Sequence, residues 1–168
     1  GTPRDSRAAF KYAREALRQR ADLEMLDLLR KLAHHLGKGD ECEKVCAQLL
    51  EDARDIKTFL TVASYYRYSA KDLDRSIAVL LQAINSMRGL LDVEGIPTYL
   101  TLLKELSETA ADNYRRTADP AEKKGKLDLA LAYLDIIMSH ATFADERLYA
   151  LYADLLRDAG KSDVFVQR

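Results

Sequence analysis

Two histidines and two cysteines form the most chemically reactive group of residues in this sequence. His34 and His35 are followed by Cys42 and Cys46, and imidazole and thiolate groups are the preferred ligands of Zn²⁺. Adjacent residues on a helix point about 100° apart, so both histidines rarely reach one metal ion. The cysteines are four residues apart, which places them on one helix face as small core residues. We therefore interpret them as packing residues and expect no metal.

Motifs for catalysis are absent from the sequence. It contains no serine, histidine and aspartate arrangement with a recognisable motif around it, and no glycine-rich phosphate loop. Acidic residues such as Asp52 and Asp55 lie in helical patterns, where a solvated helix face explains them. We therefore expect neither an enzyme nor a cofactor.

The charge balance limits the kinds of partner. Among 168 residues, 26 are Lys or Arg and 27 are Asp or Glu, for a net charge of −1. This balance argues against nucleic acid or an anionic membrane as the main partner. A local basic excess occurs in residues 1–20, which we interpret as a solvated face; its cations are Arg4, Arg7, Lys11, Arg14, Arg18 and Arg20.

The cysteine content and the apolar segments indicate a compartment. Two cysteines do not form a disulfide framework, so a reducing compartment, the cytoplasm, is expected. No run of about 18 uncharged apolar residues occurs, and the N-terminus lacks the apolar core of a signal peptide. We expect no membrane segment.

Helix is predicted for most of the chain. Glycine and proline number 7 and 3 and fall between the periodic segments, and no segment alternates apolar and polar residues as a strand does. Gly37 and Gly39 mark a helix end, and Asp119-Pro120 with Glu122 marks a helix start. The predicted helices are 6–20, 22–36, 40–53, 56–70, 73–89, 97–117, 121–139 and 144–159.

Four of these segments align without gaps. They are AFKYAREAL (9–17), CEKVCAQLL (42–50), SIAVLLQAI (76–84) and ALAYLDIIM (130–138). Their first residues are 33, 34 and 54 positions apart along the chain. A period of 33–34 residues with one helix pair in each unit is the signature of a helical repeat array.

The repeat resembles the tetratricopeptide repeat (TPR) family. The best match is 56–89, where the first-helix motif falls on Phe59, Val62, Ala63 and Tyr66 and the second-helix motif on Ser76, Leu80 and Ala83. Ala70 takes the place of the turn glycine, and one extra residue lies in the turn Ala70–Leu73. Residues 125–138 match the turn and second helix well, residues 149–160 match a first helix, and the match at 26–54 is weaker.

The resemblance implies an all-α fold, a right-handed α-solenoid of antiparallel helix pairs with about eight helices. The expected domain is a single one, 1–168. Its parts are a second helix at 6–20, repeats at about 22–54, 55–89 and 97–139, a final first helix at 144–160, and a tail at 161–168.

Two departures from the family pattern matter for function. The spacing of 54 residues places an insertion around 90–124, where the helix Pro97–Thr117 continues past the usual stop; such insertions form either a binding face or a tolerated elongation. An alternative binding surface is thus expected at Ala110, Asn113 and Tyr114. The array also begins with a second helix and ends with a first helix, which predicts excision from a longer protein or self-association through the open ends.

The resemblance implies a protein–protein interaction scaffold that binds a partner peptide or helix in a concave groove. The expected partner is a protein, with an acidic peptide favoured by the basic groove, and neither nucleic acid nor membrane is expected. The asparagine of the family's carboxylate clamp is missing, so chaperone C-termini are not the expected ligand. The alternatives are a self-associating structural segment and a regulatory module of a larger protein. The candidate groove residues are Lys31, Lys57, Thr61, Ser64, Arg67, Tyr68 and Lys104.

Overall fold

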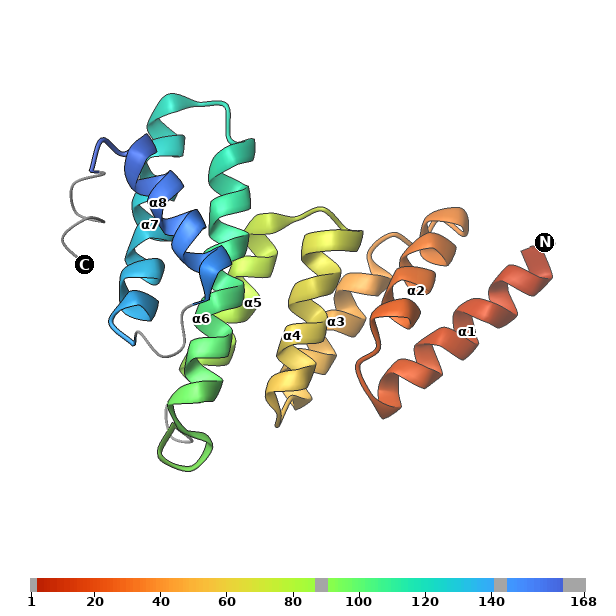
Figure 1. The fold of residues 1–168 in the computed structure, drawn as a ribbon. Helices are drawn as coiled ribbons and strands as arrows, with labels where there is room; N and C mark the ends of the chain where they lie inside the picture. Colours follow the sequence, from red (N-terminus) through yellow and green to blue (C-terminus); the bar gives the residue numbers. More distant parts are fainter. Residues whose placement is uncertain (1–2, 87–90, 141–144, 162–168) are drawn as a thin grey trace. The chain divides into compact units, whose positions relative to one another are not determined.

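The computed structural model describes residues 3–86, 91–140 and 145–161, and these residues form eight α-helices and no strand (Figure 1). The predicted all-α class is confirmed. The helices are α1 (Pro3–Gln19), α2 (Leu23–His35), α3 (Glu41–Asp52), α4 (Ile56–Ser64), α5 (Leu73–Ser86), α6 (Leu91–Arg116), α7 (Pro120–Met138) and α8 (Glu146–Asp158). A π-helical turn, η1 (Tyr65–Ser69), continues α4.

The helices divide between two compact units. Unit 1 is Gly1–Val79 and unit 2 is Leu80–Arg168, with the boundary inside α5. Within unit 1, α2 packs on α1, α3 and α4, and within unit 2, α7 packs on α6 and α8. Each unit therefore has its own core, and the expected single repeat domain stays a prediction.

The helix ends in unit 1 follow from local chemistry. Asp22 and Asp55 cap α2 and α4 by accepting hydrogen bonds from the N–H groups of Met25 and Thr58, both at 2.9 Å. Gly37 has a φ of +70°, and the next residue donates its N–H to the Ala33 carbonyl at 2.7 Å. This is the helix end that the glycine predicts.

The end of α4 differs from the prediction. The sequence predicts one regular helix over 56–70, whereas the last five residues before Ala70 form the π turn η1, in which the Ala70 N–H reaches back five residues to the Tyr65 carbonyl at 3.0 Å. Lys71 follows with a φ of +57°, a left-handed conformation usually taken by glycine. The π turn accommodates one extra residue within the helix itself.

Unit 2 contains the two longest helices. Helix α6 begins at Leu91, six residues before the predicted start at Pro97, so that prediction is wrong. Proline is favoured at a helix start because it lacks an N–H, but here it lies inside the helix. The start of α7 is confirmed, because Asp119 accepts from the Glu122 N–H at 3.0 Å and Pro120 is the first helical residue.

Buried residues follow the predicted helix faces. Ala63, Ser76 and Ala83, the small residues of the best-matching segment, are all buried, and the Ser76 hydroxyl donates to the Ala63 carbonyl at 2.8 Å. This bond joins α5 to α4 inside unit 1. Across the three described ranges, every helix is too short or too polar to span a bilayer.

Candidate functional site

The candidate groove residues lie on three helices and the π turn. Lys31 is on α2, Lys57, Thr61 and Ser64 are on α4, and Lys104 is on α6 in unit 2; Arg67 and Tyr68 are on η1. Lys31 forms an ion pair with Asp27 at 2.8 Å, and Lys104 forms one with Asp145 at 3.6 Å. Both of these lysines are therefore partly neutralised within their own units.

Asp27 is the centre of a small charged cluster on α2. It accepts from Lys31 at 2.8 Å and from Arg30 at 3.0 Å. Hydrogen bonds from Lys31 and then Arg30 hold the pKa of Asp27 below its ordinary value. The carboxylate stays ionised, and Lys31 consequently has a local partner that a bound peptide would have to displace.

Tyr68 is the one aromatic residue among the candidate groove residues and could anchor a partner. It is 57% exposed, and the guanidinium of Arg67 lies 5.0 Å from the centre of its ring. Stacking of a cation on an aromatic face holds both groups in place. The π turn thus presents an exposed aromatic ring with a half-buried guanidinium stacked beside it.

The prediction of an alternative binding surface on α6 is wrong for two of its three residues, because they are buried. Ala110 and Tyr114 are 2% and 8% exposed, whereas Asn113 is half-buried. The Tyr114 hydroxyl donates to Asp158 at 3.0 Å and so ties α6 to the end of α8. These two residues serve packing, because the extended part of α6 is covered inside unit 2.

Cys42 and Cys46 are buried free thiols, as their helix face predicts. The Cys42 thiol donates to the Leu26 carbonyl at 3.6 Å. A hydrogen bond with Cys42, together with burial, raises the pKa of Cys46. A thiol with a raised pKa is neutral and a poor metal ligand. In the part of the chain that the structure describes, no three His, Cys, Asp or Glu side chains form a group able to hold a metal ion.

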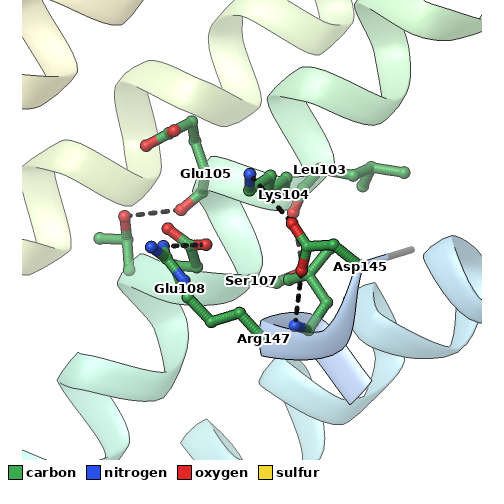
Figure 2. A network of polar contacts seen from close by, with 9 residues as sticks. Leu103, Lys104, Glu105, Ser107, Glu108, Asp145 and Arg147 are labelled. Carbon is green, nitrogen blue, oxygen red and sulfur yellow. Dashed lines mark hydrogen bonds and ion pairs between the residues drawn. The ribbon is translucent and has the colours of Figure 1, made fainter. Parts of the chain in front are cut away.

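A polar network in unit 2 joins α8 to α6 (Figure 2). Arg147 forms an ion pair with Glu108, and Lys104 forms one with Asp145. Asp145 also caps α8 by accepting from the Leu148 N–H at 2.9 Å, and this bond is the main cause of its lowered pKa. Each of these four charged groups has an oppositely charged partner, which indicates that the network fastens α8 to α6.

A cleft in unit 1 has no counterpart among the predicted sites. It has a volume of about 700 Å³ and lies between α1, α3, the connections that follow them, and the first turn of α4. Most of its charged lining residues are basic. In the sequence, the only indication of this cleft is the basic excess of residues 1–20. The lining residues are Arg14, Leu17, Arg18, Gln19, Arg20, Ala21, Glu41, Lys44, Val45, Gln48, Leu49, Asp52, Ala53, Arg54, Asp55 and Thr58.

Comparison of the chain with protein-family models, with curated proteins and with solved structures finds no match. Function must therefore be argued from the residues themselves.

Proposed function

We propose that this chain is a protein-interaction scaffold of the TPR-like helical-repeat kind, a right-handed solenoid that holds a segment of a partner protein. Support comes from the helices, which lie close to the ranges that the repeat predicts. The small residues Ala63, Ser76 and Ala83 are buried where close approach of helices requires them. Cytoplasmic localisation belongs to the same proposal.

The binding surface proposed is the exposed side of α4 and η1, and the stacked pair of Arg67 and Tyr68 carries the proposal. Tyrosine and arginine are the residue types that most often dominate the energy of protein interfaces. The ring is 57% exposed, and the cation stacked on it reduces the freedom that would be lost on binding. Lys57, exposed on α4, adds positive charge to this surface.

An acidic peptide with one apolar or aromatic side chain fits this surface best. The side chain would pack on the Tyr68 ring, and two separate carboxylates would approach Arg67 and Lys57, which are about 15 Å apart along the helix at 1.5 Å per residue. An exposed ion pair contributes roughly 0–1 kcal/mol. The contact with the ring should therefore contribute more to affinity than either cation does.

A pull-down with quantified affinity tests this proposal. A captured partner should bind Tyr68→Ala at least about tenfold more weakly, since an interface tyrosine contributes more than about 1.4 kcal/mol when it is a hot spot. Arg67→Glu should also weaken binding, and added salt should weaken it further.

Tyr12→Ala is the matched control, because Tyr12 is a 65% exposed tyrosine on α1. Its affinity should equal that of the unmodified chain. A partner that binds Tyr68→Ala as well as the unmodified chain would contradict the proposed surface.

A further inference from the structure

The cleft of unit 1 has an apolar floor that runs along one helix. Val45 and Leu49 of α3 are half-buried there, and Leu17 of α1, which also lines the cleft, is fully buried. Ala21 and Ala53 extend the lining into the connections that follow α1 and α3. The volume of about 700 Å³ is within the usual range of binding sites, roughly 300–1,000 Å³.

The shape of the cleft favours a peptide over a compact ligand. The lining residues of α3 are spaced by three, one, three, one and three positions, which is a single face of the helix; they are Glu41, Lys44, Val45, Gln48, Leu49 and Asp52. From Glu41 to Asp52 this face is about 17 Å long at 1.5 Å per residue. A site of this length matches three turns of a helix laid along α3.

The charges around the cleft favour an acidic occupant. Five lining residues are basic and three are acidic. Arg18 and Arg20 each pair with one carboxylate, at 3.3 and 3.9 Å, and their side chains are 65% and 76% exposed. Such pairs are weak and exchange readily. Arg54 donates to the carbonyls of Glu51 and Ala53 at the end of α3.

We propose that this cleft is a second binding site, for an acidic amphipathic helix of a partner protein. Its apolar side chains would cover Val45 and Leu49, and its carboxylates would pair with Arg18, Arg20 and Arg54. Helix-in-groove recognition of this kind places apolar anchors at i, i+3, i+4 and i+7. Of the candidate groove residues, none lines the cleft, so this site is distinct from the surface around Tyr68.

Selection from a displayed library of random dodecapeptides tests the proposal. The sequences selected by the full chain should include a class with net negative charge and apolar residues at helical spacing. Fluorescence anisotropy with the selected peptides should show at least tenfold weaker binding to the double variant Arg18→Glu, Arg54→Glu. Arg7→Glu, Lys11→Glu is the control, because it makes the same charge change on exposed residues of α1 that do not line the cleft.

A second variant tests the shape of the site without changing its charge. Gln48 is exposed and lines the cleft, so Gln48→Trp should fill the floor and lower affinity at least tenfold while the helical spectrum stays the same. Tyr68→Ala should leave these peptides bound, which separates this site from the proposed groove.

Three results would overturn the proposal. They are a selection without an acidic class, equal weakening by the control pair Arg7→Glu, Lys11→Glu, and full affinity in Gln48→Trp.

Discussion

The two units differ in the polar contacts that join their helices, although exposed ion pairs occur in both; in unit 1, Arg14 pairs with Glu41 and Arg75 with Glu43. In unit 1, short buried side chains donate to the backbone of a neighbouring helix, as Ser76 does to Ala63 and Cys42 to Leu26. In unit 2, side chains of α8 pair with side chains of α6 and α7, as in the pairs Glu108–Arg147, Tyr114–Asp158 and Asp135–Tyr152.

This difference determines how each unit responds to its solvent. A hydroxyl or thiol that is buried against a carbonyl has no contact with salt or protons, whereas Arg147 is 73% exposed and its pair with Glu108 is open to screening. The hydrogen bonds of Ser76 and Cys42 in unit 1 should therefore keep the same strength at any ionic strength. The ion pair that holds α8 to α6 should weaken as salt is added.

Truncation of a core leucine should have the largest effect and should show whether the units unfold separately. Leu29 in unit 1 and Leu134 in unit 2 are both fully buried. Leu29→Ala and Leu134→Ala should each lower the free energy of unfolding by about 2–5 kcal/mol, through lost burial and the cavity left behind. Hydrogen exchange should rise mainly in the unit that carries the change. A uniform rise across both units would mean that they unfold as one.

Removing one contact from each unit should distinguish the buried hydrogen bond of unit 1 from the exposed ion pair of unit 2. Ser76→Ala loses a buried hydrogen bond and should cost about 0.5–1.5 kcal/mol at any salt concentration. Arg147→Met should cost less, and its effect should shrink as salt is raised. Chemical denaturation at low and high salt measures both. A salt-dependent cost for Ser76→Ala, or a salt-independent one for Arg147→Met, would contradict the comparison.

Acid should loosen α8 through its N-cap, with the smallest effect of the three. The hydrogen bond from the Leu148 N–H and then the charge of Lys104 hold the pKa of Asp145 below its ordinary value of 3.8. The carboxylate therefore stabilises the folded state above pH 3.8, and this stabilisation is lost as the pH falls through the lower folded value. Hydrogen exchange of residues 146–158 should accelerate there.

Asp145→Asn is the matched control for acid, because asparagine also caps helices but does not titrate. Exchange in this variant should respond less to pH than in the unmodified chain. An equal response in both would assign the acid effect to other carboxylates, such as Asp27 and Asp55, whose pKa values are also lowered.

Much of the fold could be predicted because its signals are local. The 3.6-residue periodicity locates each helix, and capping chemistry at Gly37, Asp119 and Pro120 locates their ends. The same periodicity places Cys42 and Cys46 in the core, where the structure has them. Positions within one helix follow from spacing alone.

The remaining features depend on contacts between helices that are distant in sequence. The π turn lies where Tyr65 and Tyr66 are buried and where η1 packs on α2, and spacing within 56–70 carries no sign of it. The cleft forms where α1 and α3, which are distant in sequence, lie beside each other, so cations that line it, such as Arg18, are interpreted from sequence as solvated charges. The burial of Tyr114 likewise follows from the docking of α8.

The π turn also affects how this chain should be aligned and engineered. The five residues of η1 form a wider turn than an α-helix does. Side chains after η1 therefore do not point in the direction that a rotation of 100° per residue predicts. A gapless comparison of 56–89 with another helix pair therefore slips by one position after Tyr65. Deleting a single residue from Tyr65–Ser69 should restore regular winding and leave the side chains beyond the turn facing as they do now, because the π turn absorbs the extra residue. The same deletion from a regular α-helix such as α3 would instead turn every following side chain by about 100°.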